Sequence, residues 1–524
     1  MANKIKCCVE PKNLLGDQQN MISINTSKDI INNYCTYLKD ESRMPDGYAD
    51  RLVFPIDESQ IVDILQQSYQ KKESITVSGG RTGLVGGAVP LGGVVLSTEK
   101  MQVISNLPNI KDDMTITVQP GVTLNSLSDH LSKNFKSWFY PPDPTEKSAT
   151  IGGTVATNAS GARSFKYGQT RNFVKRLRIV LSDGTLLEIN RGEIFLKHDE
   201  LYHISGKQQD YQFSIPNLST SNIKNTAGYY IHPEMDFIDL FIGSEGTLGV
   251  ISEIELFLRK KSEEHFAAIA FFESNMKAYD FVQDIKQSMQ TTKIDPTAIE
   301  YFDTKSLELL RNKRMSEGSE SEIPHIDDHA QAAVFFEQEC TEAFMEEIFL
   351  TYDELLKKQN TNMDQTWGGM TKEEIQRLNQ FRHALPETVN MIIGQRQLKI
   401  PLLHKISTDF VVPAEKMNMM MQVYYNKLDH SGLDYVIFGH IGENHLHVNI
   451  LPKNEKELNQ AKLVYMELAK KAVELGGTIS GEHGIGKLKK QFLKVMFHPK
   501  LIDQFLQIKS AFDPNNCLQN GVIF

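Results

Sequence analysis

Residues 75–87 read Ile-Thr-Val-Ser-Gly-Gly-Arg-Thr-Gly-Leu-Val-Gly-Gly, so a β-branched run passes directly into a glycine-rich segment. The β-branched run 75–77 predicts a short strand. Consecutive glycines after a strand let backbone N–H groups converge on an anion, because no Cβ atom obstructs the approach. A single segment of this kind more often forms only tight turns. Whether it binds a ligand must therefore be judged from the rest of the chain.

Two more glycine-rich segments follow the first. Residues 151–161 read Ile-Gly-Gly-Thr-Val-Ala-Thr-Asn-Ala-Ser-Gly, and residues 242–249 read Ile-Gly-Ser-Glu-Gly-Thr-Leu-Gly. None of the three has the Gly-x-Gly-x-x-Gly spacing of a Rossmann site or the Gly-x-x-x-x-Gly-Lys-Ser/Thr spacing of a P-loop. Three segments that mix glycine with hydroxyl and other small residues favour a long ligand cradle over unrelated turns.

Helix and strand signals alternate around these segments. Asp57 can cap a helix with Gln60 three residues on, and apolar residues then recur at helical spacing. Short strands are predicted at 94–96 and 116–118, and a helix is predicted at 124–131. This alternation, with its glycine-rich connections, predicts an α+β fold.

The pattern changes near residue 262, where glycine becomes rare. Strands are predicted at 267–272, 334–336 and 435–438, and helices at 276–289, 343–356 and 458–472. Residues 191–222 are predicted to be a surface excursion and residues 313–330 a loop. The alternation predicts an antiparallel sheet covered by helices. The predicted parts are an N-terminal segment 1–45, a first domain 46–261, and a second domain 262–524 whose last ~30 residues pack back near the first domain.

The composition limits the classes of function. The 524-residue chain carries 56 Lys and Arg against 66 Asp and Glu, a net charge of −10, whereas nucleic-acid binders are usually basic. No apolar run approaches the ~20 residues that span a bilayer, and the N-terminus lacks the apolar core of a signal peptide. We therefore expect a cytoplasmic protein, with peripheral membrane contact left open. The five cysteines form no Cys-x-x-Cys pair, which excludes ferredoxin-type clusters and zinc ribbons.

Two histidine-containing segments lie in the second half. Residues 439–449 read Gly-His-Ile-Gly-Glu-Asn-His-Leu-His-Val-Asn, and residues 480–486 read Ser-Gly-Glu-His-Gly-Ile-Gly. Strand-like alternation places His445, His447 and Asn449 on one face, and the glycine-flanked His440 can curl back toward them. Two imidazoles and a carboxylate are a common ligand set for a catalytic divalent ion. A single buried histidine is usually a hydrogen-bonded core residue, but three near one strand favour a site.

Together the glycine-rich segments resemble the FAD-binding domain of the vanillyl-alcohol oxidase/p-cresol methylhydroxylase flavoprotein superfamily, in the same order and over roughly residues 46–260. The resemblance implies a two-subdomain FAD-binding domain followed by a substrate domain. Some members attach FAD covalently through a histidine near the first segment. This chain has no His or Cys between Cys35 and His130, which implies non-covalent FAD. The residues implied to contact FAD are Ser78, Gly79, Gly80, Arg81, Thr82, Gly83, Gly152, Gly153, Asn158, Gly161, Gly243, Glu245, Gly246, Thr247 and Gly249.

The histidine segments resemble the C-terminal domain of FAD-dependent D-2-hydroxyacid dehydrogenases. The usual pattern there is Gly-His-x-Gly-Asp-Gly-Asn-x-His-x-Asn, followed by Gly-Glu-His-Gly. The resemblance implies Zn²⁺ or Mn²⁺ at His440, His447 and Glu482, substrate contact at Asn449, and a catalytic base at His483.

Two further features bear on the substrate. Arg382 and Lys405 lie in stretches that resemble the parts of these enzymes that contact a substrate carboxylate. The alternative is that they are surface cations, and for Lys405 this alternative is nearly as strong, because the spacing there varies. Arginine can hold a carboxylate through two parallel hydrogen bonds. The chain departs from the usual pattern where Glu443-Asn444-His445 replaces Asp-Gly-Asn. His445 therefore either adds a metal ligand or changes the substrate pocket.

These resemblances imply an FAD-dependent dehydrogenase that oxidises a D-2-hydroxy acid, of the D-lactate or D-2-hydroxyglutarate class, to the 2-oxo acid. Electrons would leave to a quinone, a cytochrome, an electron-transfer flavoprotein or oxygen. Two alternatives stay open: an FAD transferase similar to alkylglycerone-phosphate synthase, and a flavin-binding subunit without catalysis. Dimers are the commonest soluble oligomers, so a homodimer is expected, and no nucleic-acid partner is expected.

Overall fold

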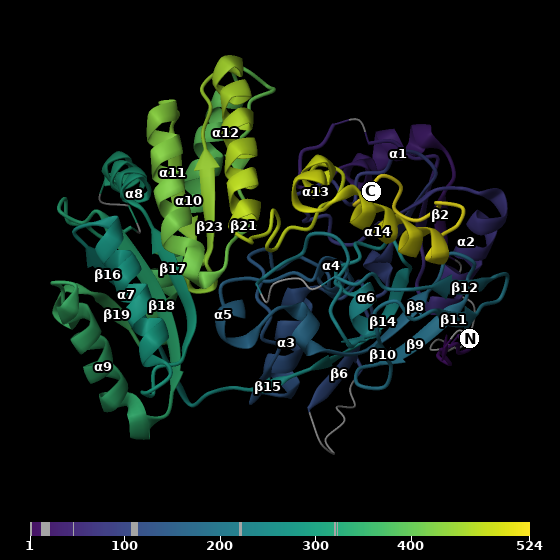
Figure 1. The fold of residues 1–524 in the computed structure, drawn as a ribbon, viewed down its shortest axis with the longest axis horizontal. Helices are drawn as coiled ribbons and strands as arrows, with labels where there is room; N and C mark the ends of the chain where they lie inside the picture. The colour runs from purple at the N-terminus through teal and green to yellow at the C-terminus, as the bar shows by residue number, and fades with distance from the viewer. Residues whose placement is uncertain are drawn as a thin grey trace. The chain divides into compact units, whose positions relative to one another are not determined.

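The computed structural model describes residues 3–11, 21–45, 47–105, 114–218, 223–318, 321 and 323–524. The chain forms two compact units (Figure 1). Unit 1 consists of Met1–Gly161, Gly168–Lys261 and Ser480–Phe524, and unit 2 of Ala162–Tyr167 and Ser262–Ile479. Among the described residues, no helix combines the length and the apolar character that crossing a membrane requires.

Unit 1 contains three main sheets. The strand orders are β2-β3-β5-β4, β6-β14-β8-β9 and β1-β11-β12. The helices and strands of unit 1 are β1 (Asn3–Lys4), β2 (Ile22–Ile24), α1 (Ser27–Asn33), β3 (Arg51–Phe54), α2 (Glu58–Lys71), β4 (Ile75–Ser78), β5 (Val94–Ser97), β6 (Thr115–Val118), α3 (Leu124–Asn134), β7 (Trp138–Phe139), α4 (Ile151–Thr157), β8 (Val174–Val180), β9 (Leu186–Asn190), β10 (Phe195–Leu196), β11 (Tyr202–Ser205), β12 (Asp210–Phe213), β13 (Met235–Asp236), α6 (Ile238–Phe241), β14 (Val250–Phe257), β15 (Arg259–Lys260), α13 (Lys490–Met496) and α14 (Pro499–Phe512).

The predicted helix after Asp57 is confirmed as α2. The Asp57 side chain accepts a hydrogen bond from the backbone N–H of Gln60, as its capping role requires, and Ile61 and Leu65 are buried. The buried face of α2 packs with residues of β4 and β5 in one apolar cluster. This cluster supports the strand from which the first glycine-rich segment emerges.

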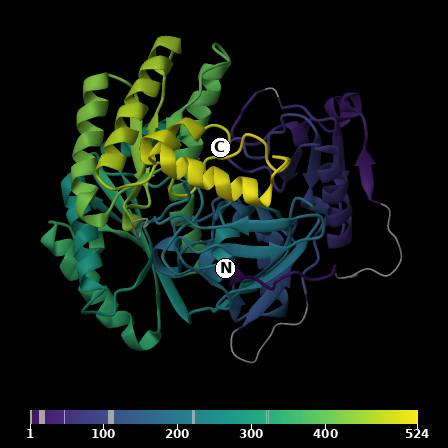
Figure 2. The ribbon, with the colours of Figure 1, turned by 45° about the vertical axis from the view of Figure 1, so that its right-hand side comes forward.

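The prediction of a surface excursion at 191–222 is wrong over residues 195–213. Residues 195–213 contain β10, β11 and β12, and Tyr211 and Phe213 are buried. Both rings contact Phe512 of α14, at centroid distances of 6.0 and 4.9 Å. The C-terminal helix, yellow in Figure 2, lies beside the teal strands of unit 1. Apolar residues alternate with polar ones in β11 and β12, which have only four residues each, so the period-2 signal is too short to stand out. Residues 219–222 lie outside the described residues.

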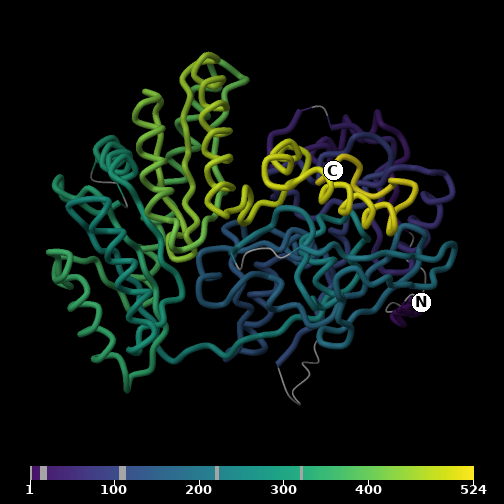
Figure 3. The backbone as a smooth tube through the Cα atoms, in the orientation of Figure 1, coloured from purple at the N-terminus to yellow at the C-terminus, as the bar shows by residue number. Residues whose placement is uncertain are grey.

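The C-terminal segment completes unit 1 (Figure 3). Leu518 forms a parallel bridge with Ile75 at the start of β4. The side chain of Gln519 accepts a hydrogen bond from the N–H of Val77 at 2.9 Å and donates to the carbonyl of Glu245 at 3.1 Å. The end of the chain therefore joins the first and third glycine-rich segments.

Unit 2 is built on an eight-stranded antiparallel sheet, as predicted. The order is β19-β16-β18-β17-β22-β23-β20, with β21 paired to β23. The helices and strands of unit 2 are α5 (Ser164–Tyr167), β16 (Glu264–Phe272), α7 (Asn275–Ser288), β17 (Pro296–Phe302), α8 (Thr304–Glu317), β18 (Ala332–Cys340), α9 (Met345–Lys358), β19 (Trp367–Gly369), α10 (Lys372–Gln397), β20 (Ile406–Ser407), β21 (Phe410–Val411), α11 (Met417–Ser431), β22 (Tyr435–Gly439), β23 (His445–Ile450) and α12 (Glu455–Glu474).

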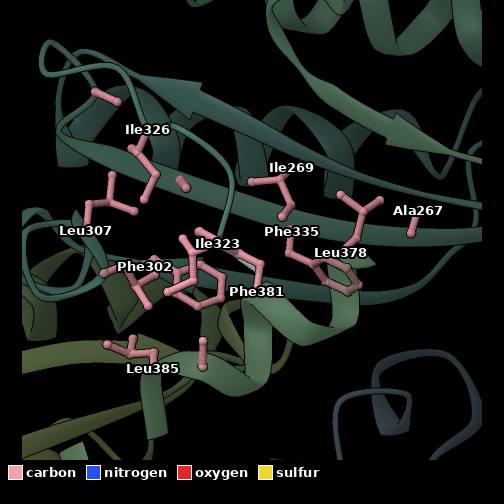
Figure 4. Packing of buried hydrophobic residues seen from close by; sticks show 14 of the residues in the cluster. Ala267, Ile269, Phe302, Leu307, Ile323, Ile326, Phe335, Leu378, Phe381 and Leu385 are labelled. Carbon is pink, nitrogen blue, oxygen red and sulfur yellow. The ribbon is translucent and has the colours of Figure 1, made fainter. Parts of the chain in front are cut away.

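Helices cover both faces of this sheet because the side chains of each strand alternate. Ile269 and Phe335 pack with α8 and α10 on one face (Figure 4). Phe266 and Phe336, from the same two strands, contact Tyr352 of α9 on the other face. The predicted loop at 313–330 is wrong over 313–317, which belong to α8. Charged residues on the exposed face of that last turn hide its helical pattern, and residues 319, 320 and 322 lie outside the described residues.

Candidate flavin site and histidine cluster

The first glycine-rich segment forms an unusual row of amide donors at the end of β4. Among the described residues, no backbone N–H from Gly79 to Gly87 donates a hydrogen bond, although Val85 and Gly86 are buried. Buried amides in proteins are almost always paired. A row of unpaired N–H groups after a strand is the arrangement that binds phosphate oxygens.

The glycines of this segment are required for two different reasons. A Cβ atom at Gly79 would lie 2.5 Å from Thr150 Oγ1, and one at Gly80 would lie 2.9 Å from the carbonyl oxygen of Ser148. The first segment is therefore pressed against the start of the second. At Gly83 a Cβ atom would meet nothing within 4 Å, so this part of the row faces open space that a ligand can occupy.

The second segment begins as the short helix α4. Thr150 caps the helix by accepting a hydrogen bond from the N–H of Gly153, and Asn158 ends it in a left-handed conformation. The Asn158 side chain donates to Gln169 at 3.0 Å and accepts from the N–H of Arg171 at 2.9 Å. Asn158 therefore holds the turn after α4 in place through its side chain.

The third segment holds the segment that contains His483. The buried Glu245 carboxylate accepts hydrogen bonds from the N–H groups of Ile485 and Gly486 at 2.7 and 2.8 Å. Burial raises the pKa of Glu245 to about 7, and the two amides offset part of that effect. A Cβ atom at Gly484 would lie 2.9 Å from the Glu245 side chain. Glu245 thus anchors the backbone on the C-terminal side of His483.

Glu482 has two partners in unit 1 that the sequence did not single out. Lys224 donates a hydrogen bond to Glu482 Oε1, and Ser160 donates to the same oxygen at 3.2 Å. The side chains of Lys224 and Glu482 are only 3% and 9% exposed. An isolated lysine in a polar stretch carries no local signal of this pairing.

Unit 2 brings three histidines together at the end of β22 and the start of β23. The ring centroids of His445 and His447 are 4.5 Å apart, and that of His440 is 5.5 Å from each. The prediction that His440 curls back toward the strand is confirmed. Glu482 and His483 belong to unit 1, so these two candidates are described separately from the histidine cluster.

Oxygen atoms around the cluster orient two of the imidazoles. Nδ1 of His447 lies 3.1 Å from the carbonyl oxygen of Thr408, and Nδ1 of His440 lies 2.5 Å from Glu300. Because these oxygens accept hydrogen bonds, each Nδ1 carries the proton and the lone pair of the neutral ring is on Nε2. A metal-binding histidine is usually held in this way by an outer carboxylate or carbonyl. Sequence reasoning missed Glu300 and Thr408, which lie far from the histidines along the chain.

The predicted substrate-binding residues occupy different environments in unit 2. Asn449 is buried in β23, and its side chain donates to the carbonyl of His447 at 3.4 Å. Lys405 donates to Asn390 at 3.0 Å in an exposed position. The Arg382 guanidinium lies 6.0 Å from the ring centroid of Phe335. Burial alone would raise the pKa of the Glu337 carboxyl, but Arg163 and then Arg382 hold it below its ordinary value.

The donor sets fit the two groups that the resemblances imply. The amide row of unit 1 suits the pyrophosphate of FAD. Imidazole nitrogens with lone pairs on Nε2 suit a divalent metal such as Zn²⁺.

Comparisons with known proteins agree with an FAD-binding unit. Residues 261–523 match the family of FAD-linked oxidases, C-terminal domain, and residues 49–190 match the FAD binding domain. The chain belongs to the FAD-linked oxidase family. It is an FAD-dependent oxidoreductase, as its two family domains and its relatives show.

The relatives of this FAD-linked oxidase cover nearly its whole length. It is 29% identical to glycolate oxidase subunit GlcD from Bacillus subtilis, over 93% of this chain and 92% of that protein. It is 29% identical to D-lactate dehydrogenase from Archaeoglobus fulgidus, over 90% of each. It is 28% identical to D-2-hydroxyglutarate dehydrogenase from Stutzerimonas stutzeri, over 100% of this chain and 98% of that protein.

The fold also resembles that of p-cresol methylhydroxylase with substrate bound, with a TM-score of 0.66 and 15% identity over 95% of this chain and 94% of that one. At this identity the likeness concerns the fold alone. Together with the two family matches, this likeness confirms the prediction of an α+β chain with an FAD-binding domain of the p-cresol methylhydroxylase type.

Replacing Gly83 with valine is expected to weaken FAD binding without unfolding the protein. The new side chain meets no protein atom within 4 Å, so it would occupy space beside the amide row. Overpacking costs about 1–3 kcal/mol, which corresponds to about 5- to 150-fold in FAD affinity. Fluorescence titration of the apoprotein with FAD measures this loss.

Gly368→Val provides the matched control, because Gly368 is also an open glycine but lies on β19 of unit 2. Its FAD affinity should equal that of the wild type. Equal affinity in Gly83→Val would show that the amide row does not bind the cofactor.

Proposed function

We propose that this protein oxidises a D-2-hydroxy acid of the lactate or 2-hydroxyglutarate class to the corresponding 2-oxo acid. The observation that carries the proposal is the histidine pair whose Nδ1 atoms are held by Glu300 and Thr408, in a chain whose other half is an FAD-binding unit. The named activities of the relatives, which act on glycolate, D-lactate and D-2-hydroxyglutarate, support the substrate class.

We assign a divalent cation, Zn²⁺ or Mn²⁺, to His440, His447 and Glu482. When bound, such an ion supplies a Lewis acid that lowers the pKa of a coordinated hydroxyl group. Glu300 and Thr408 keep the two imidazoles in the tautomer that ligation needs. Lys224 and Ser160 hold the Glu482 carboxylate in one orientation.

We assign the proton transfer to His483 and the binding of the substrate carboxylate to Arg382, Lys405 and Asn449. His483 accepts the proton of the 2-hydroxyl group, as a general base does. Bound FAD supplies the acceptor for the hydride of the C2–H bond. An external quinone, cytochrome or electron-transfer flavoprotein would then take up the electrons.

Anaerobic reduction of the bound flavin tests this function. We expect the visible flavin absorbance of the purified protein to bleach with D-lactate or D-2-hydroxyglutarate and to persist with the L-enantiomers. Glycolate, which has no stereocentre, serves as the third substrate. Each acid is added with and without Zn²⁺ or Mn²⁺, and bleaching should depend on the metal. A flavin that stays oxidised with every acid and metal would refute the proposal.

A further inference from the structure

The histidine cluster contains one imidazole more than the assigned ligand set uses. We propose that His445 is a third imidazole ligand of the divalent cation, beside His440 and His447. This inference rests on the proposed metal site and extends it, because His445 stands where the resembling enzymes have asparagine. The three residues are all in unit 2, so the inference concerns the geometry of that unit alone.

The positions of the three side chains support a shared ion. His445 is fully buried, and the candidate ligand atoms of the three histidines lie within 4.8 Å of one another. Tetrahedral ligands at about 2.1 Å from Zn²⁺ lie about 3.4 Å apart. Small rotations of the rings therefore suffice to close the site.

Asp409 stands beside His445 as Glu300 stands beside His440. Asp409 Oδ1 lies 3.0 Å from Nε2 of His445, and the two side chains are 1% and 0% exposed. The buried carboxylate favours a proton on Nε2, because a lone pair there would face a negative oxygen. The lone pair of the neutral ring is then on Nδ1. An oxygen atom therefore lies beside one ring nitrogen of each of the three histidines. Metal-binding histidines usually have such an outer partner.

The residues before His445 hold it in this position. Asn444 adopts a left-handed backbone conformation with φ +57°, and its side chain accepts a hydrogen bond from Lys286 at 2.8 Å. Glu443 accepts a hydrogen bond from Ser164 at 2.6 Å. Glu443-Asn444-His445, which replaces the usual Asp-Gly-Asn, therefore forms an ordered turn. This turn places His445 beside His440 and His447.

A third imidazole should also change which metal binds. Imidazole suits Zn²⁺, Co²⁺ and Ni²⁺, whereas Mn²⁺ prefers oxygen ligands and binds N/O sites more weakly. We therefore expect this protein to prefer Zn²⁺ over Mn²⁺, and we expect His445→Asn to reduce that preference.

Metal titration of the full-length FAD-loaded protein tests the inference. Zn²⁺ affinity is measured by competition with a chromophoric chelator, Mn²⁺ affinity by electron paramagnetic resonance, and the coordination of Co²⁺ by its visible spectrum. We expect His445→Asn to weaken Zn²⁺ binding at least about 100-fold, the upper end of what loss of an outer partner costs, and Mn²⁺ binding by less. Asp409→Asn should weaken Zn²⁺ binding about 10- to 100-fold.

His265→Asn is the control, because His265 is a partly buried histidine on β16 of the same sheet. It should leave the metal affinities unchanged. Wild-type affinity and an unchanged Co²⁺ spectrum in His445→Asn would overturn the inference. If His445→Asn does not fold, unchanged Zn²⁺ affinity in both His445→Gln and Asp409→Asn would overturn it equally.

The outcomes separate this inference from the proposed function. A wild-type protein that binds no divalent metal would overturn both the metal assignment and the role of His445. A protein that loses Zn²⁺ affinity in His445→Asn but whose flavin no hydroxy acid reduces would support the ligand and refute the proposed substrate.

Discussion

Replacing His483 with alanine is expected to slow reduction of bound FAD by the D-2-hydroxy acid by about 10²- to 10⁴-fold, the usual contribution of a positioned general base. The backbone around His483 is held independently of its side chain. Glu245 accepts from Ile485 and Gly486, and the N–H of Gly484 donates to Thr226 at 3.1 Å. The variant should therefore keep its fold and its FAD.

Anaerobic stopped-flow measurement of flavin bleaching gives the rate, and the ratio of FAD to protein verifies the cofactor. His329→Ala, at an exposed histidine of unit 2, should react like the wild type. Full turnover of an FAD-loaded His483→Ala protein would exclude His483 as the base.

Replacing Arg178 with alanine is expected to destabilise unit 1 by about 3–5 kcal/mol, because one partner of a buried ion pair is removed. The Arg178 guanidinium binds both carboxylate oxygens of Glu58, at 3.0 and 2.8 Å, and the two side chains are 3% and 7% exposed. The same guanidinium donates to the carbonyl of Glu10 at 2.9 Å. The variant leaves the Glu58 carboxylate buried without its cation.

The two tryptophans allow the effect to be assigned to one unit. Trp138 lies in unit 1 and Trp367 in unit 2, so a Trp367→Phe background makes urea unfolding of unit 1 visible by Trp138 fluorescence. Arg51→Ala serves as the control, because the Arg51–Glu73 pair is 21% and 25% exposed and should be worth about 0–1 kcal/mol. Adding Glu58→Gln to Arg178→Ala should recover part of the loss. The prediction would be contradicted if Arg178→Ala lowered the free energy of unfolding of unit 1 by no more than Arg51→Ala does.

Local signals in the sequence were sufficient for most elements that support the sites. The cap at Asp57, the β-branched run before Gly79 and the alternation in 445–449 act over a few residues, so they can be predicted without tertiary contacts. The three glycine-rich segments and the two histidine segments likewise predict FAD binding and the cluster at His440. The strands at 195–213 were missed because each is too short for its period to be distinguished.

The amino-acid sequence by itself determined the class of the fold and the residue types available for chemistry, since these follow from local patterns. FAD binding followed from the resemblance of the glycine-rich segments to a known family. Only the tertiary structure decided which distant groups orient the residues available for chemistry. Glu300 and Asp409 lie 140 and 36 positions from the histidines they face, and Lys224 lies 258 positions from Glu482. Such pairings depend on sheet register and on the return of the C-terminal segment to unit 1. No local periodicity predicts these pairings, because the hydrogen bonds and ion pairs that stabilise them form only after the chain has packed.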